Sequence, residues 1–296
     1  MKHALLVVVG AALTLVHVSA QPAAGPGTVA QRIVHTDPAA YRPLTSVHGG
    51  AGSMSFAALL GRGALTPEFN FLHRGVIPAG SGIGHHFHNV VEEMFVILDG
   101  EAQFTIDGRT ASVKGPAGVL CRTGHSHAIY NPGPAPVQWM NLNVSLVAGV
   151  YDSFDLGDSR AAATLDPIPT FMAIHLDAAL LKASGAIRSR RVAGPAMFST
   201  TWSYLDHMVV PPGASTATAP HDTVAEAYYV IGGEGSISVT GTEMGTAAIR
   251  AGDAIPVRLG ETTRFTASGS VPLELLVMGV ARDMAAKTSL LTAPPR

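Results

Sequence analysis

The sequence of 296 residues predicts an all-β fold. Glycine and proline are frequent, with 32 and 20 residues, and they punctuate chains built from short strands and tight turns. Hydrophobic residues make up 47% of the chain, which is enough to bury a sizeable core and argues against disorder. Apolar segments of strand length lie between Gly or Asp turns, for example Met94–Leu98, Ala102–Ile106, Ala227–Ile231 and Ser236–Val239.

The charge composition excludes one class of partner. Charged residues form only 14% of the chain, and 19 Lys and Arg against 21 Asp and Glu give a net charge of −2. A protein that binds nucleic acid needs a basic face to neutralise phosphates. Because this chain has no block of like charge, the sequence predicts no nucleic-acid partner.

The first twenty residues have the features of a secretory signal peptide. Lys2 precedes an apolar run, and the small residues Val18, Ser19 and Ala20 end the segment before Gln21. The run is shorter than the roughly 20 apolar residues that a membrane-spanning helix needs. We therefore expect a secreted or periplasmic mature chain without a membrane anchor. The single cysteine, Cys121, allows no internal disulfide and is expected to be a buried core residue.

An internal repeat predicts two β domains. Residues 80–100 align without gaps to residues 213–233, at a constant offset of 133 positions. The matched pairs are Pro78 and Pro211, His88 and His221, Glu93 and Glu226, and Gly100 and Gly233. A second block, residues 122–124 against residues 258–260, repeats at an offset of 136. Two matches at nearly one offset indicate a duplicated domain.

The repeat divides the chain into six parts. We expect a signal peptide at 1–20, a lead-in at 21–55, a first β domain at 56–150, a connector at 151–195, a second β domain at 196–285 and a tail at 286–296. Within the connector, residues 176–187 are expected to form a short helix.

A histidine cluster in the first domain predicts a metal site. Six of the chain's 13 histidines lie between His73 and His127. Residues two apart in a strand share a face, so His86 and His88 point the same way. Glu93 follows after a segment that can turn the chain back. Two imidazoles and a carboxylate on neighbouring strands can bind one divalent metal and leave positions open for water or substrate.

Two choices of ligand need separate reasoning. Glu92 and Glu93 are adjacent, but the repeat favours Glu93, which matches Glu226, whereas Glu92 matches Ala225. His125 and His127 offer a further imidazole pair. These two residues share one face of a strand, so periodicity alone does not choose between them.

These residues resemble the two sequence motifs of the cupin superfamily, and the duplication resembles a bicupin. The first motif is matched in full by Gly80, His86, His88, Glu93 and Gly100. The second motif is matched by Gly124, His127 and Asn131, with Arg122 in place of the usual proline. The resemblance covers residues 56–285. It implies an all-β chain of two tandem cupin-type jelly-roll β-barrels joined by the connector.

The resemblance also implies a ligand set and a cofactor. The implied ligands are His86, His88, Glu93 and His127, so the resemblance selects His127 over His125. In the second copy, Ala219 and Thr263 stand where histidines should be, and Ala267 stands where the asparagine should be. We therefore expect one divalent transition metal per chain, in the first domain. Fe or Mn is favoured, and Ni or Zn also suits these ligands.

Other residues near the motifs are candidates for contact with substrate. Phe95 and Ile97 share the inward face with Glu93 and would form an apolar wall. Arg122, His125 and Tyr130 are candidate catalytic residues, and Phe95, Ile97 and His73 are candidate substrate-binding residues.

Two functions fit this pattern. The first is a metal-dependent enzyme that acts on a small polar molecule. Similar cupins include dioxygenases, oxalate-type decarboxylases, and sugar isomerases or lyases. Since secreted bicupin decarboxylases usually keep ligands in both halves, the degenerate second copy ranks dioxygenase chemistry slightly ahead. The alternative is a non-catalytic cupin that binds a small molecule or carbohydrate and holds a structural metal. The resemblance also implies a homodimer.

Overall fold

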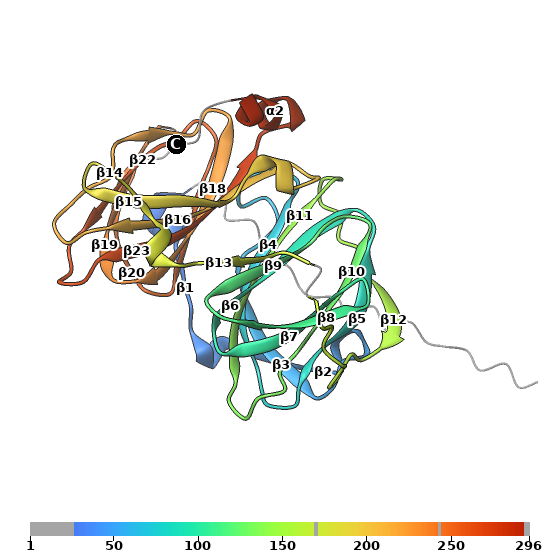
Figure 1. The fold of residues 1–296 in the computed structure, drawn as a ribbon. Coiled ribbons are helices and arrows are strands. Elements are labelled where there is room, and N and C mark those ends of the chain that lie inside the picture. Colours follow the sequence, from blue (N-terminus) through green and yellow to red (C-terminus); the bar gives the residue numbers. More distant parts are fainter. Residues whose placement is uncertain (1–26, 169–170, 242–243, 293–296) are drawn as a thin grey trace, which may run out of the picture.

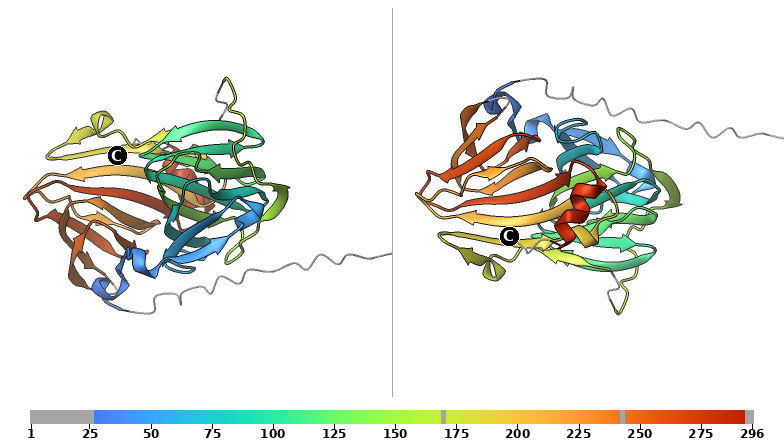
Figure 2. Two further views of the ribbon diagram at one scale, coloured as in Figure 1. Left: turned by 90° about the horizontal axis from the view of Figure 1, so that it is seen from below. Right: turned by 90° about the horizontal axis from the view of Figure 1, so that it is seen from above.

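The fold is seen in a computed structural model that describes residues 27–168, 171–241 and 244–292. The expected signal peptide lies outside the described residues. Four antiparallel sheets pair into two β-barrels, which confirms the predicted fold class. Figures 1 and 2 show the barrels side by side, the first mainly blue to green and the second mainly orange to red. No helix among these residues is long and apolar enough to cross a membrane.

The first barrel consists of a seven-stranded and a five-stranded sheet. In spatial order, the larger sheet contains β13 (Ala173–His175), β9 (Ala117–Cys121), β6 (Val91–Asp99), β11 (Val137–Ser145), β4 (Phe69–Ile77), β3 (Ser53–Leu60) and β2 (Arg42–Thr45). The smaller sheet contains β12 (Phe154–Asp158), β5 (Gly82–His88), β10 (His125–Tyr130), β7 (Glu101–Ile106) and β8 (Arg109–Lys114).

The second barrel repeats this plan with a seven-stranded and a four-stranded sheet. The larger sheet contains β1 (Val34–His35), β21 (Asp253–Val257), β18 (Val224–Gly232), β23 (Leu273–Ala281), β16 (Trp202–Val210), β15 (Ile187–Ala193) and β14 (Lys182–Ser184). The smaller sheet contains β17 (Ala219–Pro220), β22 (Thr262–Ala267), β19 (Glu234–Thr240) and β20 (Gly245–Arg250).

The two large sheets share a hydrophobic core between the barrels. Met94 and Val96 of β6 cluster there with Leu205, Leu276 and Met278 of the second barrel, and all five are at most 2% exposed. Their neighbours in β6 face the other way, because successive residues of a strand alternate between its two faces. Alternation along β6 therefore separates the interface between the barrels from the interior of the first barrel.

The lead-in and the connector differ from expectation, because both add strands to the barrels. β1 pairs with β21 of the second barrel, whereas β2 pairs with β3 of the first. Helix α1 (Val29–Arg32) buries Arg32, whose guanidinium forms an ion pair with Glu261 at 2.8 Å. From the connector, β12 joins β5 and β13 joins β9. These segments therefore complete the sheet edges.

The helix expected over residues 176–187 is not formed. A 3-10 turn, η3 (Ala178–Leu180), is followed by the hairpin of β14 and β15. Gly185 turns this hairpin at a φ of +61°, and β15 then pairs with β16, so sheet pairing outweighs the local helical pattern. Three further 3-10 turns are η1 (Pro38–Ala40), η2 (Val47–Gly49) and η4 (Pro195–Met197).

The expected tail begins inside a helix, α2 (Met284–Thr292), which lies at the junction of the barrels in Figure 1. Its Lys287 is 3% exposed and donates hydrogen bonds to the carbonyls of Phe198 and Thr200, at 2.6 and 2.5 Å. Burial lowers the pKa of this ammonium group.

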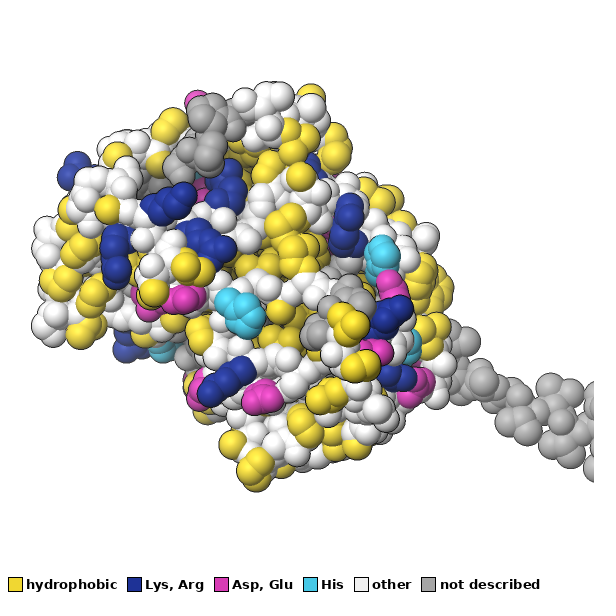
Figure 3. All heavy atoms as spheres, in the orientation of Figure 1, with side chains coloured by type: hydrophobic (Ala, Val, Ile, Leu, Met, Phe, Trp, Pro, Cys, Tyr) yellow, Lys and Arg dark blue, Asp and Glu magenta, His cyan; other side chains and the backbone are white. Residues whose placement is uncertain are grey.

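On the face shown in Figure 3, Lys and Arg side chains gather mainly over the second barrel. Cys121 is buried and free, as expected.

Candidate metal centre

Four side chains meet inside the first barrel. His86 and His88 come from β5, His127 comes from β10 and Glu93 comes from β6. His127 lies opposite His86 in the β5–β10 ladder, and β6 belongs to the facing sheet. The ligand atoms of these four residues lie within 4.8 Å of one another, and all four residues are at most 2% exposed. The structure thus brings together the four residues that the resemblance selected.

Backbone carbonyls orient two of the imidazoles. His86 Nδ1 donates to the Gly84 carbonyl at 2.8 Å, and His88 Nδ1 donates to the Asp152 carbonyl at 2.5 Å. A carbonyl oxygen only accepts, so these contacts place the ring proton on Nδ1 and leave the Nε2 lone pair facing the cluster. Neutral histidines oriented in this way are ready to bind a metal.

The distances within the cluster fit a shared cation. The Nε2 atom of His127 lies 2.9 Å from that of His86 and 3.1 Å from that of His88. Glu93 Oε2 is 3.1, 3.5 and 4.0 Å from the Nε2 atoms of His127, His88 and His86. Lone pairs and a carboxylate this close repel one another unless a proton or a cation lies between them. Three histidines and one glutamate are a suitable donor set for Mn, Fe, Ni or Zn.

The pKa directions show how strongly these groups interact. Burial would raise the pKa of Glu93, but hydrogen bonds and charges from His127 and His88 hold it well below its usual range. Burial, together with the neighbouring His127 and His48, pushes the pKa of His86 well down. Burial also lowers the pKa of His127. For His88, burial lowers the pKa, but its contact with Glu93 outweighs burial and raises it.

A chain of amides fixes the Glu93 carboxylate. Asn143 Nδ2 on β11 donates to Glu93 Oε1 at 3.1 Å, and Asn70 Nδ2 donates to Asn143 Oδ1 at 2.8 Å. Glu93 Oε2 is the oxygen that faces the histidines. The carboxylate therefore has one oxygen held by the protein and one directed into the cluster. Outer contacts of this kind orient ligands and tune metal affinity.

The neighbouring Glu92 points the opposite way, as the repeat predicted, but it is fully buried. It accepts hydrogen bonds from the backbone N–H groups of Ser199 and Thr200, at 2.5 and 2.9 Å, and from Thr200 Oγ1 at 2.7 Å. Glu92 therefore joins the first barrel to the chain that enters the second. Sequence reasoning could not find this contact, because the partners of Glu92 lie more than 100 residues away.

The predicted substrate-facing residues line the barrel interior. Phe95 is 2% exposed and its ring lies 5.7 Å from that of His127, centroid to centroid, while Ile97 is fully buried on the same face. His73 stacks on Phe71 at 3.9 Å, and burial lowers its pKa to about 3. His73 lies opposite Asn141 of β11, two residues along that strand from Asn143, the partner of Glu93.

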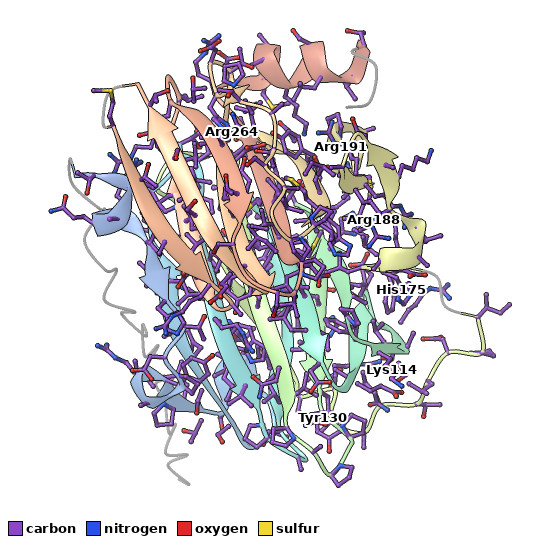
Figure 4. All side chains as sticks on the ribbon, turned by 90° about the vertical axis from the view of Figure 1, so that its left-hand side faces the viewer. Lys114, Tyr130, His175, Arg188, Arg191 and Arg264 are labelled. Atoms are coloured by element: carbon purple, nitrogen blue, oxygen red, sulfur yellow. The ribbon has the colours of Figure 1, made fainter. Side chains whose placement is uncertain are left out.

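The predicted catalytic candidates lie elsewhere. Arg122 donates to Ser199 Oγ at 3.0 Å, at the junction with the second barrel. His125 is 46% exposed and pairs with Asp107 at 2.6 Å. Against the effect of burial, the backbone hydrogen bond from Ser126, together with this pairing, lowers the pKa of the Asp107 carboxyl. Tyr130 lies at the end of β10, opposite Gly82, and Figure 4 shows it at the end of the molecule remote from the second barrel. His125 lies opposite His88 in the β5–β10 ladder, but its imidazole pairs with Asp107 instead of joining the four-residue cluster.

Sequence reasoning missed three residues beside the cluster. The ring of His48 stacks on that of His86 at 3.9 Å, and its Nδ1 lies 2.5 Å from Asp155 Oδ1. His48 has a φ of +51°, which is uncommon for a residue other than glycine. Tyr151 lies 5.8 Å from His88, ring to ring. These residues lie outside the motifs, and only the folding of residues 46–52 and 151–158 against β5 brings them near.

The second barrel has a different arrangement at the same place. Ala219 lies opposite Thr263, as His86 lies opposite His127. His221 contacts Thr263 Oγ1 at 2.8 Å and Glu226 at 3.2 Å. The hydroxyls of Tyr204 and Tyr228 each donate to one Glu226 oxygen. No second metal-like group of His, Cys, Asp and Glu is found among the described residues.

Comparisons with known proteins agree with this geometry. The model of the cupin domain family matches residues 73–144. An oxalate-binding protein of Thermotoga maritima is 31% identical over 105 residues, which are 35% of this chain and 85% of that protein.

Solved structures resemble the whole two-barrel chain. The oxalate decarboxylase of Lactobacillus farciminis, in complex with formate, has a TM-score of 0.63 and 14% identity, covering 88% of this chain and 90% of that one. The Bacillus subtilis oxalate decarboxylase, which has Mn(II) centres, has a TM-score of 0.62 and 15% identity, covering 84% of this chain and 77% of that one. The chain belongs to the cupin superfamily and, with its two tandem barrels, is a bicupin.

Proposed function

We propose that this bicupin is a metal-dependent enzyme that acts on a small carboxylic acid at one centre in its first barrel. The observation that carries the proposal is the buried group of His86, His88, Glu93 and His127, with all ligand atoms within 4.8 Å. Four protein ligands around a six-coordinate Mn or Fe ion leave two positions for substrate oxygens. We also propose that the protein acts after export, and the homodimer stays a prediction.

The residues around the centre have different roles. A bound divalent ion would polarise a substrate carbonyl or carboxylate and neutralise charge that develops beside the breaking bond. Asn143 holds one Glu93 oxygen, and the Gly84 and Asp152 carbonyls fix two imidazoles. The Phe95 ring, 5.7 Å from that of His127, would shield this side of the centre from water, and Ile97 extends the same apolar face along β6.

The named relatives favour decarboxylation over the dioxygenase chemistry that the sequence ranked first. One relative is called oxalate-binding, and the solved structures are oxalate decarboxylases. The resemblance in fold does not by itself fix the reaction. His86, His88, Glu93 and His127 would hold a divalent ion that would bind and polarise the substrate carboxylate. In the proposed reaction the C–C bond to the carboxylate breaks, CO₂ leaves, and the remaining carbon takes up a proton.

A second candidate function is carboxylate binding without turnover. The oxalate-binding relative supports it, since that protein is named for binding alone. Turnover separates the two candidates. The metal-loaded chain would be incubated with oxalate and with 2-oxo acids, while CO₂ release and dioxygen uptake are recorded. CO₂ release without dioxygen uptake supports the decarboxylase, and tight binding with no product supports the binding protein.

Metal content tests the basis of both candidates. The full chain is purified, supplied with Mn(II) or Fe(II), freed of loose metal and analysed for metal per chain. We expect about one equivalent, bound through imidazole and carboxylate donors. His86→Ala is expected to abolish uptake, while His221→Ala, at the second-barrel position that matches His88, keeps it. Two equivalents, or loss of metal only in His221→Ala, would contradict a single site in the first barrel.

A further inference from the structure

Aromatic side chains form a closed circuit inside the first barrel that begins and ends at the histidine cluster. We call Phe56, Phe71, Phe95, Trp139 and Tyr151 the aromatic belt. Centroid distances around the circuit are 5.8 Å from His88 to Tyr151, 5.7 Å to Phe71, 3.9 Å to His73, 4.7 Å to Phe56, 6.2 Å to Trp139, 5.5 Å to Phe95 and 5.7 Å to His127. A molecule held at the cluster would therefore meet aromatic faces beside it.

The belt has an accessible side. Phe71, His73 and Tyr151 keep part of their surface exposed to solvent, although each contacts other members of the circuit. Phe71 also lies outside the clusters of buried hydrophobic residues. The half-buried Phe71 side chain is thus surface that a ligand could cover.

Two buried polar atoms at the belt, one of Trp139 and one of the neighbouring Asn141, lack a hydrogen-bond partner in the described part of the chain. Asn141 is 6% exposed and Trp139 is 1% exposed, and both belong to β11. Asn141 Oδ1 and Trp139 Nε1 make no hydrogen bond among the described residues. Asn141 lies opposite His73 on one side and Phe95 on the other, so it faces the same interior. Buried groups of this kind are normally paired, here with a ligand or with water.

The charge near the cluster limits the ligand further. A divalent ion, three neutral imidazoles and one carboxylate carry a single net positive charge. The side chains that contact the cluster are the stacked imidazole of His48, the rings of Tyr151 and Phe95 and the Asn143 amide. His73 is neutral near pH 7. One negative charge on a ligand would balance this site, whereas two would leave an uncompensated charge in a buried place.

We propose that the first barrel selects a monocarboxylate with a 2-oxo or 2-hydroxy oxygen and an aromatic side group, in preference to the oxalate dianion. The carboxylate and its neighbouring oxygen would occupy the open positions of the metal, and the aromatic group would lie against Phe71 and Tyr151. This inference rests on the proposed function, because it takes the metal as the anchor for the carboxylate.

Calorimetric titration of the Mn(II)-loaded full chain with phenylpyruvate, pyruvate and oxalate tests the inference. The first two share one chelating head and differ by a phenyl ring. Burial of such a ring is expected to make phenylpyruvate bind about tenfold tighter than pyruvate, or more. We also expect phenylpyruvate to bind tighter than oxalate. In Phe71→Ala the preference over pyruvate should fall to about threefold or less, with pyruvate affinity unchanged.

Phe154→Ala is the matched control, because Phe154 is an aromatic residue of the same barrel that is 56% exposed. It should leave all three affinities unchanged. Oxalate binding as tight as phenylpyruvate, or a phenyl preference that survives Phe71→Ala, would overturn the inference while a bound Mn(II) ion leaves the proposed function intact. A chain that takes up no Mn(II) in the same samples would overturn the proposed function, and the ligand assignment with it.

Discussion

The two barrels keep one carboxylate at the same place and surround it with different partners. Glu93 in the first barrel matches Glu226 in the second, and both are at most 6% exposed. Three imidazoles face Glu93, whereas one imidazole and two tyrosine hydroxyls face Glu226. The offset of the repeat places Tyr204 at the position of Phe71, and Tyr228 at that of Phe95.

A small set of exchanges therefore separates a site that needs a cation from one that does not. The phenol hydroxyls donate protons to both oxygens of Glu226, so the chain itself satisfies this carboxylate. The second barrel also has Gly279 opposite Glu226, where the first barrel has Asn143 opposite Glu93. A Cβ atom on Gly279 would lie 2.2 Å from the Tyr204 ring, so only glycine there leaves room for that ring. Loss of metal ligands came together with groups that replace the metal.

The largest effect is expected from a double variant that removes both tyrosine hydroxyls from Glu226 in the second barrel. In Tyr204→Phe/Tyr228→Phe, the buried carboxylate of Glu226 loses both phenol donors. We expect the free energy of unfolding to fall by about 3–6 kcal/mol, since each of the two hydrogen bonds to a charged group contributes about 1.5–3 kcal/mol. Urea unfolding of the metal-free chain measures this loss. A change below about 0.5 kcal/mol would mean that Glu226 does not depend on these hydroxyls.

The outer faces of the two barrels differ at Glu92, whose counterpart in the second barrel is Ala225. Glu92→Ala leaves the N–H groups of Ser199 and Thr200 and the Thr200 hydroxyl without their acceptor. We expect a loss of about 2–3 kcal/mol in unfolding free energy, because buried unpaired donors are costly. Metal content should stay at one equivalent, which separates Glu92 from Glu93. Loss of metal in this variant would contradict the assignment of Glu93 as the ligand.

Asn143 provides a sharper test of the centre itself. Asn143→Leu removes the donor to Glu93 Oε1 without touching a proposed ligand. We expect Mn(II) affinity to fall about 10–100-fold, as is usual when an outer partner of a metal ligand is lost. Competition with a chelator of known affinity measures this change. Asn141→Leu, on the same strand but without a contact to Glu93, should stay within about twofold; equal losses in both variants would point to a general packing defect.

Features that depend on residues close in sequence could be predicted, whereas contacts between distant segments could not. The all-β class, the duplication and the grouping of His86, His88 and Glu93 were predictable, because motif spacing and strand alternation are local. The choice of His127 over His125 and the barrel architecture came only from the resemblance to cupin motifs. The positions of His48, Tyr151 and Asp155 were not, since segments that pair only in the folded chain bring them to β5. The helix expected at 176–187 failed for the same reason, because pairing with β16 decides its structure. Tyr204 and Tyr228 were within reach of a closer comparison of the repeats.

The smallest expected effect concerns His73, whose counterpart in the second barrel is Asp206. Burial lowers the pKa of His73 to about 3, so the native imidazole stays neutral while the unfolded chain takes up a proton below about pH 6.5. Its contribution to stability is therefore complete above that pH and is lost as the pH falls. One such group accounts for up to about 2 kcal/mol of destabilisation between pH 7 and pH 5.

His73→Phe keeps a ring that can stack on Phe71 and Phe56 and removes the titrating group. Urea unfolding of the metal-free chain at pH 7 and pH 5 should show a smaller loss of stability in this variant than in the wild type. His86 and His127, whose pKa values are also lowered by burial, contribute equally to both proteins and cancel in the comparison. His175→Phe, which removes an exposed imidazole of β13, is the control for a general effect of losing a histidine. An unchanged pH dependence in His73→Phe would show that this residue is protonated in the native barrel, and the interior next to Glu93 would then be wetter than its burial indicates.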